Sequence, residues 1–245
     1  RVRLMARDCM SDIDVVILAG GQGTRIRGIL GNTPKILAPV NGTAFLDILL
    51  RRLRQFGVQR FVLCLGHLAD RVRKHIGSEI DVELSIEPEP LGTGGALRFA
   101  RQKLRSDPVL VMNGDTWLDA DLCEFVERHQ QSRASISMLC VPVSDSARFD
   151  VVEIDTDGVL TFPSREKGRT GIGASLISAG TYLLSGSALD ALSANAGVSL
   201  EHDLLRRGVL GPILGFVPED TSFIDIGTPE SLRDAGRWVG RRDQP

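Results

Sequence analysis

The sequence lacks the features that mark membrane proteins, secreted proteins and nucleic-acid-binding proteins. Among its 245 residues, no apolar run approaches the length of a membrane span, and residues 1–12 hold no apolar core long enough for a signal peptide. A net charge of −2 provides no basic surface for nucleic acid or an anionic membrane. Together with 42% hydrophobic and 24% charged residues, these absences predict a soluble, cytoplasmic, globular protein.

Cysteine and histidine are both scarce. The four cysteines, Cys9, Cys64, Cys123 and Cys140, show no metal-ligand spacing. We expect all four to be reduced thiols. The four histidines are dispersed through helix-like segments, so the chain has no convincing Ser/His/Asp or Cys/His catalytic set.

What the sequence does contain is a glycine-rich turn directly after a buried strand. Residues 13–19 are apolar without alternation, which is typical of a strand buried on both faces of a parallel sheet. Three glycines within residues 20–23 then let backbone N–H groups approach a polyphosphate closely. Arg25 and Lys35 follow as cations that can face phosphate oxygens.

Two common glycine-loop motifs do not match this turn. A P-loop closes with Gly-Lys-Ser/Thr, whereas Gly23 is followed by Thr24 and Arg25. The dinucleotide-binding fingerprint needs a third glycine at the position of Ile26. The second mismatch disfavours a dehydrogenase.

The hydrophobic pattern of the first half predicts a doubly wound α/β fold. Further strands are expected at residues 61–65, 81–86, 108–112 and 135–143. A helix at residues 45–56 is one of those expected between them. This repetition predicts a mostly parallel, mixed, Rossmann-like sheet flanked by helices.

The domain organisation is expected to be simple. Residues 1–12 are interpreted as a flexible leader or tag remnant. Residues 13–245 are expected to form one domain, with a nucleotide-binding half at 13–145 and a sugar-phosphate-binding half at 146–245. The second half is predicted to contain a hairpin, a long strand at 174–184 and a small lid region.

The turn motif resembles the signature of a known enzyme family. Leu18-Ala-Gly-Gly-Gln-Gly-Thr-Arg25 followed by Pro34-Lys35 is similar to the motif of the sugar-1-phosphate nucleotidyltransferases. These enzymes make a nucleotide sugar and pyrophosphate from a nucleoside triphosphate and a sugar 1-phosphate. Similar motifs continue along almost the whole chain from residue 13.

The resemblance implies a role for each matching residue. It assigns nucleotide binding to Leu18, Ala19, Gly20, Gly21, Gly23, Thr24, Glu87, Pro90, Gly92, Thr93 and Asn113. It assigns catalysis to Arg25, Lys35 and Lys167, and sugar binding to Asp150, Glu166, Gly180 and Glu201. It also implies that Asp115 and Asp225 hold Mg²⁺ between them.

The two aspartates suit this role on chemical grounds as well. Mg²⁺ prefers hard oxygen ligands and keeps several waters while it also binds substrate phosphates. Asp115 follows a buried strand and a glycine at the expected sheet edge. Asp225 lies between Ile224 and Ile226, where a carboxylate needs a partner.

Among family members, the motifs most resemble those of the D-glycero-D-manno-heptose 1-phosphate guanylyltransferases. That resemblance implies GTP as donor and a GDP-heptose product for a surface polysaccharide or glycoprotein. Mannose, glucose or N-acetylmuramate 1-phosphate with GTP, UTP or dTTP remain alternatives, as do a non-catalytic nucleotide-sugar sensor and a glycosyltransferase. The family often dimerises, and the sequence leaves the oligomeric state open.

Two residues depart from the family pattern. Asp150 stands where the family usually has glycine, and Ser178 replaces a common asparagine. Both positions fall in the expected sugar pocket. The phosphate-binding motifs are unaffected.

Overall fold

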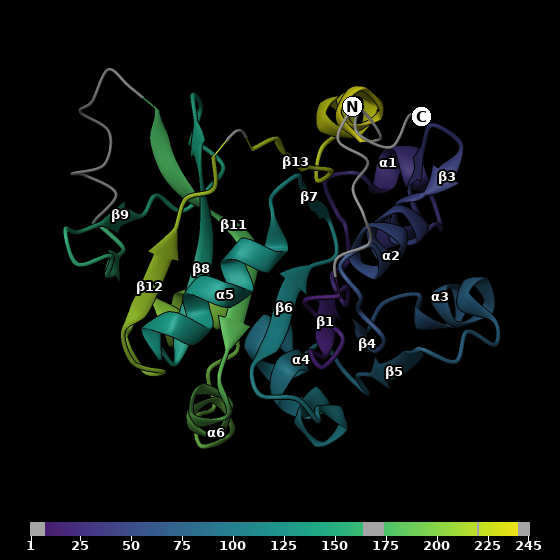
Figure 1. The fold of residues 1–245 in the computed structure, drawn as a ribbon. Helices are drawn as coiled ribbons and strands as arrows, with labels where there is room; N and C mark the ends of the chain where they lie inside the picture. Colours follow the sequence, from purple (N-terminus) through teal and green to yellow (C-terminus); the bar gives the residue numbers. More distant parts are fainter. Residues whose placement is uncertain (1–7, 164–173, 220, 240–245) are drawn as a thin grey trace.

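The computed structural model describes residues 8–163, 174–219 and 221–239. Within these residues, seven strands form a central sheet in the spatial order β12-β8-β11-β6-β1-β4-β5 (Figure 1). The strands are β1 (Val15–Leu18), β4 (Phe61–Leu65), β5 (Val82–Ile86), β6 (Val109–Asn113), β8 (Ile136–Val143), β11 (Ser175–Leu184) and β12 (Ile213–Phe216). β11 runs antiparallel to both of its neighbours, and the other pairs are parallel. The predicted mixed, mostly parallel sheet is therefore confirmed.

Strand β1 is buried on both faces, as its unbroken apolar run predicts. Val15 and Ile17 belong to a core on one side of the sheet, whereas Val16 belongs to a second core on the other. All three side chains are fully buried. Successive residues of a strand point to opposite faces, so β1 joins the two cores.

Helices cover both faces of the sheet. They are α1 (Arg27–Leu30), α2 (Phe45–Arg54), α3 (Ala69–Ile76), α4 (Gly92–Ala100), α5 (Leu122–Ser132), α6 (Gly186–Ser193) and α7 (Pro229–Trp238), with 3-10 segments η1 (Lys35–Leu37) and η2 (Arg101–Lys103) and a π-helix η3 (Leu200–Leu205). Buried residues of α2 and α5 belong to the first core, and those of α4, α6 and η3 to the second.

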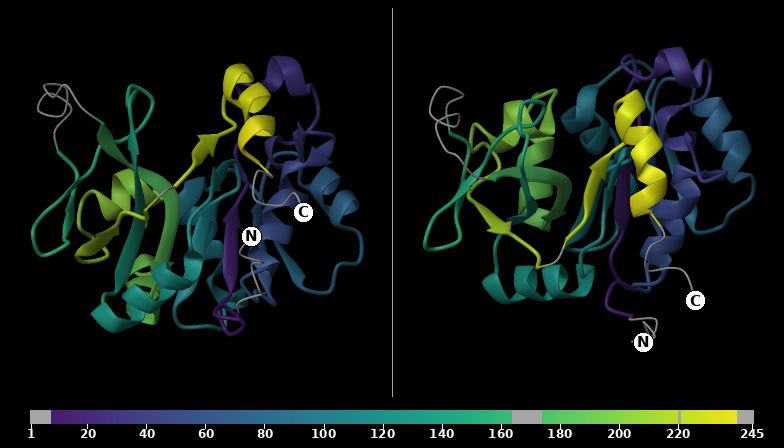
Figure 2. Two further views of the ribbon diagram at one scale, coloured as in Figure 1. Left: turned by 45° about the horizontal axis from the view of Figure 1, so that its top comes forward. Right: turned by 90° about the horizontal axis from the view of Figure 1, so that it is seen from above.

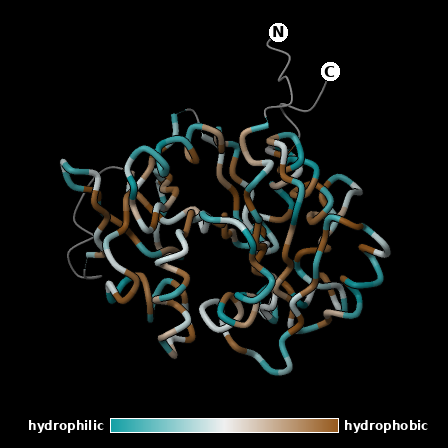
Figure 3. Tube along the Cα trace, turned by 60° about the horizontal axis from the view of Figure 1, so that its bottom comes forward, coloured by the Kyte–Doolittle hydropathy of each residue, from teal (hydrophilic) through white to brown (hydrophobic). Residues whose placement is uncertain are grey.

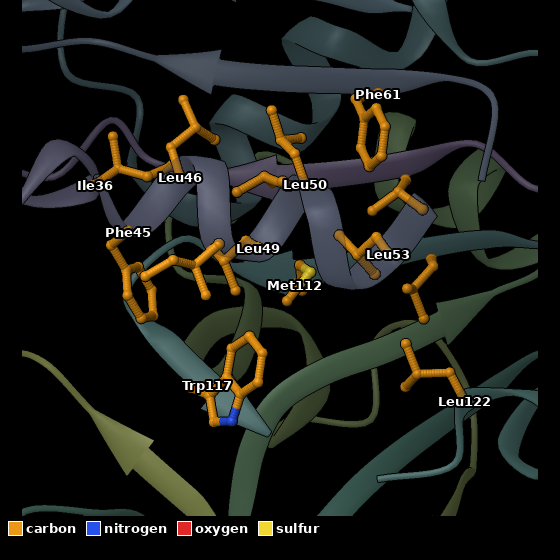
Figure 4. Close-up of a cluster of buried hydrophobic side chains, with 14 of the residues drawn as sticks. Ile36, Phe45, Leu46, Leu49, Leu50, Leu53, Phe61, Met112, Trp117 and Leu122 are labelled. Carbon is orange, nitrogen blue, oxygen red and sulfur yellow. The ribbon is translucent and has the colours of Figure 1, made fainter. Parts of the chain in front are cut away.

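Helix α2 shows how the apolar pattern becomes packing. Its leucines recur at helical spacing and form one buried face. Figure 4 shows this face over Met112 of β6 and Trp117 of β7 (Thr116–Leu118). The helix thereby covers the strands that end at the cavity described below.

The remaining strands are short. They are β2 (Pro39–Val40), β3 (Thr43–Ala44), β9 (Glu153–Ile154), β10 (Leu160–Thr161) and β13 (Phe223–Asp225). The predicted hairpin corresponds to the β9–β10 pair. β13 pairs antiparallel with β7, a pairing between the two halves of the chain.

The final helix also returns to the first half. Thr228 caps α7 and Pro229 occupies its first turn. Asn41 Nδ2 donates a hydrogen bond to Gly236 O at 2.9 Å. Figure 2 shows α7 in yellow beside the purple N-terminal elements. The two halves are therefore interlocked.

The structure corrects the expected start of the folded domain at residue 13 and the expected reduced state of Cys9 and Cys123. Met10 is fully buried, and its N–H donates to Phe56 O at 3.0 Å, so the packed structure begins before residue 13. Cys9 and Cys123 form a disulfide, whereas Cys64 and Cys140 are free and buried. The sequence could not indicate this pairing because 114 positions separate the two cysteines.

Hydropathy along the chain follows this architecture. Figure 3 shows many hydrophobic stretches in the interior of the trace and hydrophilic stretches at many peripheral turns. Within the described residues, every helix is too short or too polar to cross a membrane.

Candidate active site

The site lies where parallel strands end together. In the sheet register, Leu18 of β1 pairs with Asn113 of β6 and Cys64 of β4. β5 ends at Ile86 beside Leu65. The segments that follow these strands consequently meet at one sheet edge, where open α/β sheets bind ligands.

A cavity of about 370 Å³ lies at this edge. It is lined by Leu18, Ala19, Gly20, Gly21, Gln22, Gly23, Lys35, Ile36, Glu87, Pro90, Gly92, Thr93, Ala96, Asn113, Gly114 and Asp115. Every residue predicted to bind the nucleotide is in this set except Thr24. Thr24 and Arg25 are exposed and do not line the cavity.

Glu87 is the buried carboxylate of this cavity. Its side chain is 9% exposed, and Oε2 accepts a hydrogen bond from Leu91 N–H at 2.8 Å. Burial raises the pKa of the Glu87 carboxyl, and the Leu91 hydrogen bond offsets part of that rise. A Cβ at Gly20 would lie 2.7 Å from Oε1, so a larger residue there would displace the Glu87 carboxylate.

Lys35 and the two candidate metal ligands form a charged group beside the cavity. Lys35 Nζ lies 2.5 Å from Asp115 Oδ2. Asp225 Oδ1 accepts from Arg148 Nη2 at 2.9 Å and from Gly227 N–H at 2.7 Å. Arg148 is therefore the partner expected for the Asp225 carboxylate.

The strand pairing brings the two aspartates close together. β13 pairs with β7 so that Asp225 lies opposite Thr116, and Ile226 N–H donates to Asp115 O at 2.9 Å. Within the described residues, no group of three or more His, Cys, Asp or Glu side chains could hold a metal ion. Two carboxylates nevertheless fit Mg²⁺, which takes one or two carboxylates together with substrate phosphates.

Gly180 lies on β11, the strand next to β6, and the Glu201 side chain contacts the same strand. Gly180 has φ +66°, and a Cβ there would overlap the Asn113 side-chain amide. The Glu201 carboxylate accepts hydrogen bonds from Ser178 Oγ at 2.7 Å and from the Tyr182 hydroxyl. Ser178, the departure from the family asparagine, thus helps to hold Glu201.

Asp150 contacts the side chains of Arg206 and His202. Its Oδ1 lies 3.3 Å from Arg206 Nη1, and its Oδ2 lies 3.3 Å from His202 Nε2. The predicted residues Glu166 and Lys167 lie outside the described residues.

Sequence reasoning did not assign several residues that the tertiary structure brings to the site. Gln22, Ile36, Ala96 and Gly114 line the cavity, although all four lie in or next to the motifs already identified. The Arg148–Asp225 pair joins residues 77 positions apart, and no local pattern signals it.

Comparison with known proteins finds similar sequences over most of the chain. The family model described as Nucleotidyl transferase matches residues 14–241. A D-glycero-alpha-D-manno-heptose 1-phosphate guanylyltransferase of Aneurinibacillus thermoaerophilus is 32% identical over 227 residues, covering 91% of this chain and 96% of that protein. A mannose-1-phosphate guanylyltransferase of Mycobacterium tuberculosis is 32% identical over 230 residues, covering 90% of this chain and 62% of that protein.

Solved structures show the same similarity. The crystal structure of HddC from Yersinia pseudotuberculosis has a TM-score of 0.79 and 33% identity, covering 92% of this chain and 99% of that chain. HddC complexed with GMP-PN has a TM-score of 0.78 and 32% identity, with the same coverage.

Proposed function

The chain belongs to the nucleotidyl transferase family, and we propose that it makes a GDP-heptose and pyrophosphate from GTP and D-glycero-α-D-manno-heptose 1-phosphate. A relative with that printed activity matches nearly its full length to this chain. HddC has been crystallised with GMP-PN, and its structure also matches over nearly its full length. These similarities support a nucleotide-sugar synthase that uses a guanine nucleotide.

The reaction is a displacement at phosphorus. A phosphate oxygen of the sugar 1-phosphate attacks the α-phosphorus of GTP, and the bond to the β-phosphate breaks as pyrophosphate leaves with the electron pair. The attacking phosphate is already an anion at neutral pH, so the enzyme needs no general base. Catalysis then rests on positioning and electrostatics, which explains how the chain works without a Ser/His/Asp set.

Lys35 is the described cation best placed for this electrostatic role. It lines the cavity beside the glycine turn, where the triphosphate would lie. We assign it to the charge that develops on the departing pyrophosphate. Arg25 is exposed and is assigned to the same phosphates, while Lys167 and Glu166 are assigned to the sugar phosphate and sugar hydroxyls.

Mg²⁺ is part of the proposal. Asp115 and Asp225 would hold it, since the strand pairing places them side by side and carboxylates are its preferred protein ligands. Bound there, the ion would neutralise charge on the triphosphate.

Glu87 is the observation that supports guanine in particular. An ionised carboxylate only accepts hydrogen bonds, and the Watson–Crick edge of guanine presents two adjacent donors, N1–H and N2–H₂. Uracil and thymine instead present one N–H between two carbonyl oxygens, which a carboxylate repels. A buried carboxylate in the nucleotide cavity therefore favours guanine over uracil and thymine.

A pyrophosphate-release screen tests the proposal. GTP, UTP, dTTP, ATP and CTP are each combined with heptose, mannose, glucose and N-acetylmuramate 1-phosphates in the presence of Mg²⁺. We expect the highest kcat/KM with GTP and heptose 1-phosphate. Pyrophosphate from another pair would reassign the substrates, and none from any pair would favour a nucleotide-sugar sensor or a glycosyltransferase.

A matched pair of variants tests the role of Glu87 in the same assay. Glu87→Gln should lower kcat/KM for GTP by about ten- to hundredfold, because the amide nitrogen faces a guanine donor. Glu89→Gln, two positions along and exposed, should leave it unchanged. An unaltered GTP preference in Glu87→Gln would remove Glu87 from base recognition.

The location and assembly of the enzyme remain predictions. The use of nucleoside triphosphate substrates supports a cytoplasmic location, whereas disulfides are uncommon in the cytoplasm. A homodimer is expected from the family resemblance alone.

A further inference from the structure

Asp150 occupies a position where a direct sugar contact was expected, yet its side chain is directed into the protein. Only 12% of the side chain is exposed. Both carboxylate oxygens face cations or potential cations of one helix, with Oδ1 at Arg206 and Oδ2 at His202. A buried carboxylate needs such compensation.

Arg206 connects Asp150 to other parts of the second half. Its Nη2 donates to Pro163 O at 2.9 Å, and its guanidinium lies 5.6 Å from the centroid of the Phe162 ring. The planar guanidinium can serve a carboxylate, a carbonyl and an aromatic face together. Arg206 thus fastens the end of η3 to two neighbouring segments.

The same helix carries Glu201. Arg206 N–H donates to Glu201 O at 2.8 Å, so the two residues share one turn of η3. The Glu201 carboxylate reaches Ser178 and Tyr182 on β11. Asp150 adjoins the same strand, since Val151 bridges to Ile177.

Helix η3 is therefore attached to the β11 region at two points. One is the Glu201 carboxylate itself, and the other is the Asp150–Arg206 ion pair. Without the second attachment, the turn that carries Glu201 can rotate or shift relative to β11. Even a small shift of Glu201 would matter, because binding groups act only within a narrow range of positions.

We propose that Asp150 and Arg206 are a positioning pair that holds η3 so that Glu201 can bind the sugar 1-phosphate. Asp150 then acts through Arg206 and not as a sugar ligand. This inference rests on the proposed function, because it concerns the sugar-phosphate side of the same reaction. It also explains how a carboxylate can stand where the family usually has glycine.

A double-mutant cycle distinguishes positioning from direct sugar binding. Asp150→Asn, Arg206→Gln and the double variant are compared with the unaltered enzyme for KM of each substrate. Each single variant should raise KM for the sugar 1-phosphate about tenfold, and the double variant should raise it by about the same factor, since coupled residues are not additive. KM for GTP should change less than twofold. A general loss of folded protein would instead lower the apparent kcat and leave both KM values unchanged.

Two further variants complete the test. Arg206→Lys keeps the charge but loses the planar contacts to Pro163 and Phe162, so it should restore only part of the sugar affinity. Arg207→Gln removes an adjacent exposed arginine and should have no effect. Multiplied effects in the double variant, about a hundredfold, would mean that Asp150 contacts the sugar independently and would overturn the proposal. An unaltered KM in Asp150→Asn would overturn it as well.

The proposed function can fail separately. If the unaltered enzyme prefers another sugar 1-phosphate, the cycle is measured with that substrate. If it releases no pyrophosphate, the proposed function itself is wrong. If the enzyme is active but Asp150 and Arg206 show no coupling, only the proposal of a positioning pair is wrong.

Discussion

Lys35 Nζ lies 2.5 Å from Asp115 Oδ2, which joins two residues that are 80 positions apart in the sequence. Their side chains are 18% and 34% exposed, so solvent screens much of their attraction. The pair contributes little to stability for that reason. Its value is positional, because it places a cation and a candidate metal ligand in the same cavity wall.

We expect Lys35→Ala to reduce kcat by about 10²–10³-fold while the protein stays folded, because it removes a charge that stabilises the transition state. Asp115→Asn should reduce kcat similarly, with a Tm change of only a few degrees. Pyrophosphate release and thermal unfolding are the measurements. Lys35→Arg serves as the charge-conserving control, and near-normal turnover in Lys35→Ala would contradict the assigned role.

Gly180→Ala should destabilise the protein and weaken nucleotide binding. Gly180 combines a φ of +66° with close approach to the Asn113 amide, so the new Cβ meets both backbone strain and a steric clash. Gly158→Ala is the matched control, since Gly158 has φ +81° and its nearest neighbour to a Cβ is 3.7 Å away.

Urea unfolding and KM for GTP measure the difference between these two variants. Gly158→Ala should lose about 1 kcal/mol from its backbone conformation, and Gly180→Ala about 1–3 kcal/mol more. Equal losses in the two variants would show that the Asn113 contact relaxes at no cost.

The affinity for GTP should weaken on acidification at a higher pH than for an ordinary glutamate. Burial raises the pKa of Glu87, so the carboxyl gains a proton, and loses an acceptor, above its usual range near 4.5. KM for GTP, measured across the acidic range, should rise as the pH falls through this raised pKa. In Glu87→Gln the rise should be absent, and a rise of the same size in that variant would assign it to another group.

His129 should make the protein less stable as the pH falls below neutrality. Burial lowers the pKa of His129 from its ordinary 6.5, and its Nδ1 lies 2.8 Å from Ser137 Oγ. The unfolded chain therefore binds the proton first, and the free energy of unfolding decreases as the pH falls through 6.5 toward the lowered pKa.

Urea unfolding at several pH values tests this prediction. His129→Gln should flatten the dependence between neutrality and the lowered pKa, whereas the exposed His67 can be changed to Gln without flattening it. An unchanged dependence in His129→Gln would mean that other groups produce it.

Reduction of the Cys9–Cys123 disulfide should lower the free energy of unfolding by about 2–4 kcal/mol, because a long loop in the unfolded chain is no longer closed. Thermal unfolding with and without reductant measures this. The double variant Cys9→Ser/Cys123→Ser should lose the dependence on reductant.

Thiol titration provides an independent check on the disulfide. Burial raises the pKa values of Cys64 and Cys140 to about 12, so neither should react in the native protein. Native protein should gain reactive thiols only after reduction. Four free thiols in unreduced, denatured protein would show that the disulfide does not form.

Local patterns in the sequence were sufficient for much of the fold and for most of the residues that line the candidate cavity. The apolar run before the glycine turn predicts β1, and helical spacing predicts α2, because each pattern is set by neighbours a few residues apart. The glycine turn and the segment around Glu87 each follow a strand. Parallel strands carry such segments to one edge, so the topology itself assembled the predicted cavity.

The sequence alone thus determined most strands of the sheet, the family resemblance and most of the cavity lining, since these depend on short motifs and their order. Only the tertiary structure decided the partners of the charged side chains and of Cys9. Lys35 with Asp115, Arg148 with Asp225, and Arg206 with Asp150 are pairs whose members lie 56 to 80 positions apart. Any Lys or Arg can neutralise any carboxylate that folding brings near it, so residue type and spacing carry no record of which pairs form.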